Sequence, residues 1–251
     1  MGALPGSPRR GEGELSLLQL LPNLITITAI VAGLTAIRFG IQGNYELSAQ
    51  LIVLAALLDG IDGRIARALK SDSRLGAELD SLADFLNFGV APPLVVYFWV
   101  LQDAPSAGWL AVLVFSVCCV LRLARFNVWN KAGPGRDELW FVGVPAPAGA
   151  LLVMLPMFLS FAIAEAPDLP PGPVAAYMVL IGLALISRLR TPSLRQVRIA
   201  RGRVRYVIVA LAFVGAALMT YPWVTLALLC LAYVAAVLAG LFRHRRRGEG
   251  R

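Results

Sequence analysis

The sequence predicts an all-α membrane protein, a polytopic helical bundle of about eight transmembrane helices with both termini in the cytoplasm. Hydrophobic residues make up 58% of the 251 residues and the mean hydropathy is +0.73, which leaves no room for a separate soluble domain. Apolar runs of helical length recur along the chain. When these runs are taken as spans, 22 of the 23 Lys and Arg residues fall on one side, which the positive-inside rule makes cytoplasmic.

The N-terminal segment precedes the first span. Met1 to Glu14 is rich in Gly, Pro and Arg, and we expect it to be disordered. Leu15 to Leu21 is expected to form a short interfacial helix before Pro22 starts the first span. A secretory signal is the competing interpretation, because Arg9 and Arg10 precede an apolar stretch.

The remaining elements follow the apolar runs in order. The expected spans are residues 22–39, 46–69, 75–101, 109–126, 143–164, 173–189, 205–220 and 222–242. Several are short or interrupted by proline, so the expected number is eight with an error of about one. The basic tail, 243–251, is expected to anchor the last span on the cytoplasmic side. Residues 1–251 then form a single integral-membrane domain.

Four aspartates lie at helical spacing inside this apolar chain. An ionised carboxylate near the middle of a membrane helix costs about 2.5 to 3.5 kcal/mol, so cations must compensate the group. One helical stripe contains Asp59, Asp62, Gly63, Ala66 and Arg67, and a stripe on the next helix contains Gly76, Asp80 and Asp84. If these two helices are antiparallel neighbours, their carboxylates face each other.

The carboxylate cluster predicts a site for divalent cations. Carboxylate oxygens suit Mg²⁺ or Mn²⁺, which also bind substrate phosphates. Small residues on the same stripes allow a bulky ligand to approach the backbone. The alternative is a set of structural salt bridges with Arg64, Arg67 and Arg74. Such a network requires neither the regular four-residue spacing nor the glycines, so the metal site is the favoured interpretation.

At this point the sequence resembles a known family. The pattern from Asp59 to Asp84 matches the CDP-alcohol phosphotransferase signature at every defined position. The flanking segments 80–92, 122–127 and 141–147 look like the phosphatidylserine synthase branch of that family. The resemblance extends from about Leu21 to Leu152 and fades in the last hundred residues.

The resemblance implies a reaction and a set of roles. The donor would be CDP-diacylglycerol, the acceptor hydroxyl that of L-serine, and the products phosphatidylserine and CMP. The four aspartates would hold two divalent cations, with Asp84 also acting as general base. The donor would be bound by Asp62, Gly63, Ala66, Arg67, Ser73 and Gly76. Family members are often homodimers, so a homodimer is expected as well.

Two arginines and an asparagine near the end of the fourth expected span are candidates for binding serine or phosphate. Arg122 and Arg125 are spaced by three residues, and Asn127 follows. Guanidinium groups suit carboxylate or phosphate. The competing interpretation is that both arginines extend to the lipid headgroups, as terminal arginines commonly do.

Two other functions stay open at this stage. The residues of the signature bind the CDP half of the donor and say little about the acceptor. The acceptor could therefore instead be glycerol phosphate, an inositol phosphate or another alcohol. An ion-coupled transporter with intramembrane aspartates is the alternative from a different class. The only histidine, His244, is in the tail, which excludes a Ser-His-Asp site. The net charge of +8 fits loops against anionic lipid headgroups in a bacterial inner membrane, with no nucleic-acid partner.

Overall fold

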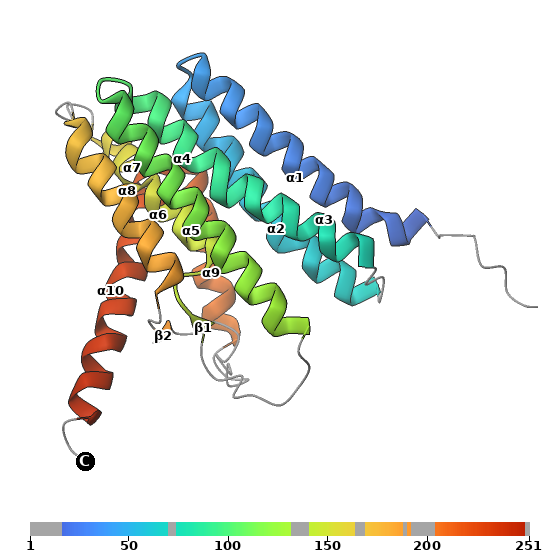
Figure 1. Ribbon diagram of the computed structural model, residues 1–251. Helices are drawn as coiled ribbons and strands as arrows, with labels where there is room; N and C mark the ends of the chain where they lie inside the picture. Colours follow the sequence, from blue (N-terminus) through green and yellow to red (C-terminus); the bar gives the residue numbers. More distant parts are fainter. Residues whose placement is uncertain are drawn as a thin grey trace, which may run out of the picture.

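The protein folds into a bundle of long helices that lie side by side (Figure 1). The structure, a computed structural model, describes residues 17–69, 74–131, 141–163, 169–187, 190–191 and 204–248. The expected disordered segment 1–14, Ser73 and the last three residues of the tail lie outside these ranges.

Helices account for nearly all of the described chain. In order, the elements are α1 (Leu17–Ile41), α2 (Tyr45–Leu69), α3 (Arg74–Asp84), η1 (Phe85–Val90), α4 (Ala91–Val96), η2 (Tyr97–Leu101), α5 (Pro105–Lys131), β1 (Phe141–Val142), α6 (Ala146–Val153), α7 (Leu155–Ala162), α8 (Pro171–Ile186), β2 (Arg190–Thr191), α9 (Val204–Thr220) and α10 (Pro222–Gly248). The segments η1 and η2 are π-helical and continue α3 and α4 into one rod. The described helices thus form eight continuous rods, which in chain order are α1, α2, α3 to η2, α5, α6 with α7, α8, α9 and α10.

Length and composition support fewer membrane crossings than the eight expected. Within the described residues, four helices are long and apolar enough to cross a membrane: Leu21–Ile41, Leu75–Leu101, Pro105–Val128 and Pro222–Gly240. The charged residues of α2 lower the hydropathy of that helix. A break at Met154 divides the fifth rod into two helices, α6 and α7, of eight residues each. The rods that contain α8 and α9 are shorter apolar helices. The chain is thus an integral membrane protein with four clear spans.

The first helix begins earlier than expected. We predicted that Pro22 would start the first span, but α1 is continuous from Leu17 and has Pro22 inside it. A proline lacks the N–H that a helix interior needs, yet near the start of a helix that N–H has little to bond to. The expected interfacial helix and the first span are therefore one element.

The π-helical turn η1 has a cause in the residues that follow it. Pro92 and Pro93 are the first residues after Ala91 in α4, and neither can donate a backbone hydrogen bond. In a regular α-helix the backbone N–H of residue 93 would donate to the carbonyl of Gly89, four residues earlier, but proline has no N–H. That carbonyl instead accepts a hydrogen bond from the Ser116 hydroxyl of α5, at 2.7 Å. This hydrogen bond joins the third rod to α5 five residues after Asp84.

Small residues bring the helices close together. The α1–α2 hairpin turns at Gly43, whose φ of 79° is in the left-handed region that favours glycine. The Ser48 hydroxyl of α2 donates to the carbonyl of Ala36 in α1, at 2.6 Å. In α8, a Cβ at Gly182 would lie 3.0 Å from the Cα of Phe115 in α5. The core between the rods is filled by large buried side chains, among them Phe88, Phe115 and Phe158.

The fold is all-α as expected, and its one addition in the described residues is a two-residue antiparallel pairing of β1 with β2. Phe141 pairs with Thr191 and Val142 with Arg190. Gly143 then turns the chain into the fifth rod with a φ of 91°, and a Cβ there would collide with the carbonyl oxygen of Leu185. Hydropathy could not predict this pairing, because it joins two short connections far apart in sequence.

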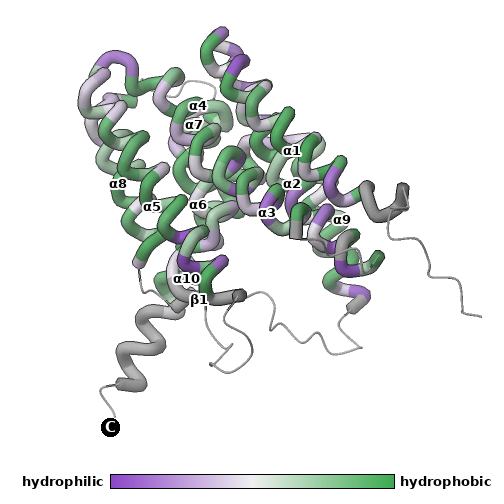
Figure 2. Tube along the Cα trace, turned by 45° about the vertical axis from the view of Figure 1, so that its right-hand side comes forward, coloured by the Kyte–Doolittle hydropathy of each residue, from purple (hydrophilic) through white to green (hydrophobic). Residues whose placement is uncertain are grey.

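Most positions along the helices are hydrophobic, and hydrophilic positions occur on α2 and α3 (Figure 2). Exposed apolar side chains include Leu24 and Val31 on α1 and Phe213 and Met219 on α9. Apolar exposure on this scale is typical of a surface in contact with lipid.

Candidate functional site

The two acidic stripes meet where α2 approaches α3. Oxygen atoms of Asp59, Asp62 and Asp80 all lie within 4.8 Å of one another. Asp59 and Asp62 come from α2 and Asp80 from α3, as the helical spacing predicted. We call these three residues the aspartate triad. Its donor set consists of carboxylate oxygens, the ligands preferred by Mg²⁺ and Mn²⁺.

The surroundings of Asp62 give the clearest indication that the triad suits a cation. Its side chain is only 3% exposed, and its Oδ1 atom is buried with no hydrogen-bond partner among the described residues. The other oxygen, Oδ2, accepts a hydrogen bond of 2.6 Å from the hydroxyl of Thr26 in α1. A buried carboxylate oxygen without a donor is costly unless it is paired. A divalent cation held by the triad would supply the missing partner.

Thr26 orients Asp62, and its replacement should weaken the site. Thr26→Val keeps the shape of the side chain but removes the hydroxyl, so we expect metal affinity or activity to fall by about tenfold, the lower end of the effect of losing a partner of a metal ligand. The measurement is the Mg²⁺ concentration that gives half-maximal activity. Thr28→Val is the matched control, because Thr28 is exposed on the same helix and donates to the Leu24 carbonyl. Equal metal dependence in both variants would contradict the role of Thr26.

Asp84 lies beside the triad and next to a buried arginine. Its carboxyl group is within hydrogen-bonding range of Asp59. Two carboxyl groups this close require a proton or a cation between them. The Asp84 carboxyl also interacts electrostatically with the guanidinium of Arg122 in α5, which is 9% exposed. Asp84 is thus placed between the triad and the polar groups of α5.

The residues expected to bind the donor surround the triad on the same two helices. A Cβ on Gly63 would have the Nη1 atom of Arg67 at 3.7 Å as its nearest neighbour, so the backbone is open to a ligand there. Arg67 is exposed and is close enough to Asp80 for their charges to interact, in the direction that the salt-bridge alternative expects. Gly76 lies in α3 one turn before Asp80. The side chain of Ala66 is outside the description, as is Ser73.

The two arginines of α5 are in different surroundings. Arg122 is buried, and within the described part of the chain its Nε atom has no hydrogen-bond partner. Arg125 is exposed, and its Nη1 donates to the carbonyl of Ile186 in α8, at 3.4 Å. Asn127 donates from Nδ2 to the hydroxyl of Ser81 in α3, at 2.9 Å, and so connects α5 to the helix of the site.

Sequence reasoning missed three polar residues that the fold brings near the site or behind it. Thr26 is the partner of Asp62. Asn87 in η1 is fully buried against Gly33 of α1, with both amide atoms unpartnered. Tyr233 in α10 has a buried hydroxyl without a partner and interacts electrostatically with Arg122. Only Asn87 is close in sequence to the acidic stripes, so local spacing contained no signal for the other two.

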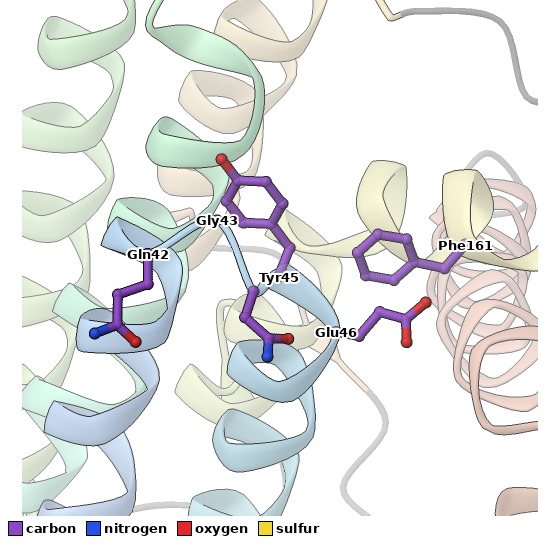
Figure 3. A pocket seen from close by; sticks show the side chains of 6 residues that line it. Gln42, Gly43, Tyr45, Glu46 and Phe161 are labelled. Carbon is purple, nitrogen blue, oxygen red and sulfur yellow. The ribbon is translucent and has the colours of Figure 1, made fainter.

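A separate hollow lies at the opposite end of α2 from the triad (Figure 3). It has a volume of about 360 Å³ and contains one carboxylate, that of Glu46, close to the ring of Phe161. Its lining residues are Gln42, Gly43, Asn44, Tyr45, Glu46 and Phe161. Asp59 is roughly 20 Å farther along α2 at 1.5 Å per residue, so this hollow is not part of the acidic site.

Comparison with known proteins identifies the family to which the chain is similar. A family model described as CDP-alcohol phosphatidyltransferase matches residues 19–189, and one described as CDP-alcohol phosphatidyltransferase 2 matches residues 204–237. Three similar proteins are each named CDP-diacylglycerol--serine O-phosphatidyltransferase. The protein from Mycobacterium leprae is 38% identical over 222 residues, 88% of this chain and 74% of that protein. The protein from Mycobacterium tuberculosis (strain H37Rv) is 37% identical over 234 residues, 92% and 81% of the two chains.

The third similar protein, from Helicobacter pylori (strain 26695), is 34% identical over 181 residues, 72% of this chain and 75% of that protein. The first family model covers well over half of the chain, and it includes both acidic stripes and the arginines of α5. The chain therefore belongs to the CDP-alcohol phosphatidyltransferase family.

Proposed function

We propose that this protein transfers the phosphatidyl group from CDP-diacylglycerol to the hydroxyl of L-serine, giving phosphatidylserine and CMP. The observation that carries the proposal is the aspartate triad in a membrane-embedded bundle of this family. The choice of serine is supported by the printed names of relatives that cover most of the chain. The reaction breaks the bond between the phosphorus attached to diacylglycerol and the oxygen of CMP, and forms a bond to the serine oxygen.

Asp59, Asp62 and Asp80 are the residues that would hold the metal, with Asp84 adjoining Asp59. When bound, two Mg²⁺ or Mn²⁺ ions would neutralise the charge that develops on the phosphoryl oxygens and on CMP. The triad oxygens and the unpartnered Oδ1 of Asp62 fit this chemistry. The metal identity and the number of ions belong to the proposal.

Asp84 is the proposed general base. A base must lie within hydrogen-bonding reach of the proton that it removes and near the metal-bound phosphate. Asp84 adjoins the triad through Asp59 and faces the buried polar groups of α5. A serine hydroxyl between Asp84 and the donor phosphorus could transfer its proton to this carboxylate while the oxygen attacks.

The donor is proposed to bind along the small-residue stripes, with its acyl chains in the membrane. Replacing Gly63 by Leu should raise the KM for CDP-diacylglycerol by about tenfold, because the side chain would project beside Arg67 into the space for the ligand. Gly60→Leu on the same helix is the matched control, since no atom lies within 4 Å of a Cβ there. Equal donor KM in the two variants would show that Gly63 serves helix packing alone.

The proposal also covers the location of the protein and its assembly. The triad lies toward the C-terminal end of α2, the end that the positive-inside rule assigns to the cytoplasm, so we infer an active site open to the cytoplasm, in the bacterial inner membrane. Serine would then enter from the cytosol. The homodimer is inferred from the family, and the mass of the protein in detergent solution would test it.

The decisive experiment is an assay of CMP release from CDP-diacylglycerol by the purified protein. We expect CMP to appear with L-serine and not with glycerol phosphate or inositol phosphate. If CMP is released only with one of these other alcohols, that alcohol is the acceptor and serine is not, while the assignment as a CDP-alcohol phosphotransferase stands. No CMP release with any alcohol would favour the transporter alternative.

A further inference from the structure

The hollow at the start of α2 takes no part in the proposed reaction (Figure 3). It has a volume of about 360 Å³ and is lined by the α1–α2 turn, the first residues of α2 and one residue of α7. A space of this size is at the lower end of the range for sites that bind small molecules. Because the triad is roughly 20 Å away along the same helix, a ligand of the hollow would bind independently of the triad.

The side chains of the hollow favour a cation. Among the described residues that line it there is one carboxylate, that of Glu46, and no Lys, Arg or His. Glu46 is exposed, and its carboxylate lies close to the ring of Phe161 (Figure 3). A carboxylate pairs with an ammonium group, and the face of an aromatic ring attracts one as well. Glu46 would repel an anion, so the hollow selects for positive charge.

The start of α2 does not reverse this preference, although the first turn of a helix commonly attracts an anion. The Asn44 side chain caps the helix, because its Oδ1 accepts from the backbone N–H of Leu47 at 3.2 Å. Glu46 supplies a negative charge in the first turn. The hydroxyl of Tyr45 donates to the carbonyl of Phe98 in η2, at 2.8 Å, and so is engaged within the protein.

The ring of Phe161 is held in place by two tryptophans from other helices. Its centroid is 5.0 Å from that of Trp223 in α10 and 6.4 Å from that of Trp99 in η2, both in edge-to-face geometry. A binding group needs such support to be precise. Three rods therefore fix the aromatic wall of the hollow, while α2 contributes its carboxylate.

Exposed apolar residues flank the hollow on both sides. Ile41, directly before Gln42, is 63% exposed, and Ile163, two residues after Phe161, is 55% exposed. In an integral membrane protein such side chains meet the acyl chains of lipids. The hollow is thus a polar space beside lipid, where a lipid headgroup can enter while its chains stay in the membrane.

We propose that the hollow binds the primary ammonium group of a zwitterionic phospholipid. An ammonium group has three N–H donors, so it can pair with the Glu46 carboxylate, donate to the side-chain amide oxygen of Gln42 and lie against the Phe161 ring. The phosphate of the headgroup would stay outside the hollow, away from Glu46. The inference goes beyond the proposed function, because it concerns a lipid site that the reaction does not use.

The test measures the thermal midpoint of the purified protein in detergent as phosphatidylethanolamine is added. The lipid should raise the midpoint of the wild type. Glu46→Gln keeps the size of the side chain but removes its charge, so it should need about fivefold more lipid for half of the rise, the upper end of the effect of an exposed ion pair. Phe161→Leu removes the aromatic face and should weaken the response in the same direction.

The matched control is Asp103→Asn, which removes an exposed carboxylate five residues after Phe98 and outside the hollow. It should respond to phosphatidylethanolamine as the wild type does. Phosphatidylglycerol with the same acyl chains and free ethanolamine are the control ligands. The first lacks the ammonium group and the second lacks the acyl chains, so neither should give a rise that depends on Glu46.

Three results would overturn the inference. An equal response to phosphatidylethanolamine in Glu46→Gln and the wild type would leave Glu46 with a structural role at the start of α2, whatever the midpoint without lipid. A Glu46-dependent rise with phosphatidylglycerol would show that the ammonium group is not recognised. A Glu46-dependent rise of the same size with free ethanolamine would make the ligand a soluble amine. The assay of CMP release tests the proposed function separately, so the failure of one leaves the other standing.

Discussion

Replacing Asp59, Asp80 or Asp84 by Asn is expected to lower CMP release by about a hundredfold or more, the scale of losing one preorganised electrostatic group in an active site. Asparagine keeps the shape of the side chain but removes the charge that would hold a cation or accept the serine proton. Asp62→Asn should also be severe, although a ligand to one metal only would leave some activity. The measurement is the initial rate of CMP release at saturating Mg²⁺.

The same experiment needs a control and a metal titration. Asp103→Asn is the control, because Asp103 is exposed in the turn that follows η2, whereas Asp80 lies near the opposite end of the same rod, in α3. We expect it to retain full activity. Excess EDTA should abolish the activity of the wild type, and added Mg²⁺ or Mn²⁺ should restore it. Full turnover in EDTA would contradict the metal site.

Replacing Gly182 by Leu is expected to destabilise the bundle by roughly 3 kcal/mol, the upper part of the usual range for overpacking. Even a Cβ at this position would lie 3.0 Å from the Cα of Phe115, so the larger side chain must push α8 away from the backbone of α5. The measurement is the thermal midpoint in detergent, which should fall clearly below that of the wild type.

The matched control for this substitution lies on the same helix. Gly172 is near the start of α8, and no atom lies within 4 Å of a Cβ there. Gly172→Leu should therefore keep the wild-type midpoint. If both leucine variants unfold at the same temperature, the close approach of α5 and α8 at Gly182 does not limit stability.

Much of the helix arrangement could be predicted because hydropathy and helical periodicity are local properties. The expected ranges 46–69 and 75–101 agree closely with α2 and with the rod from α3 to η2. The first helix was misjudged at Pro22, since a proline near a helix start permits either a break or a continuous helix. Among the described residues four helices have the length and hydropathy of spans, so the expected number of eight stays a prediction. The helix α2 is rich in charged residues and the rod of α6 and α7 is broken at Met154, and both therefore lack one of these two properties.

The aspartate stripes show how much of the site could be predicted from the sequence. A period of 3.6 residues puts Asp59 and Asp62 on one face of α2, and it does the same for Asp80 and Asp84 on α3. It does not say how two helices are rotated against each other, which depends on the packing of side chains across their interface. The fold places Asp80 with the triad and Asp84 beside Asp59 and Arg122.

The sequence by itself determined the membrane bundle, the acidic stripes and the family signature, all of which depend on residues close together in the chain. Only the tertiary structure decided which distant groups complete the site. Thr26 reaches Asp62 across 36 positions, and Asn127 of α5 donates to Ser81 of α3 across 46 positions. The physical reason is that a buried polar group must find its partner in space, and packing between helices, not spacing along one of them, brings that partner near.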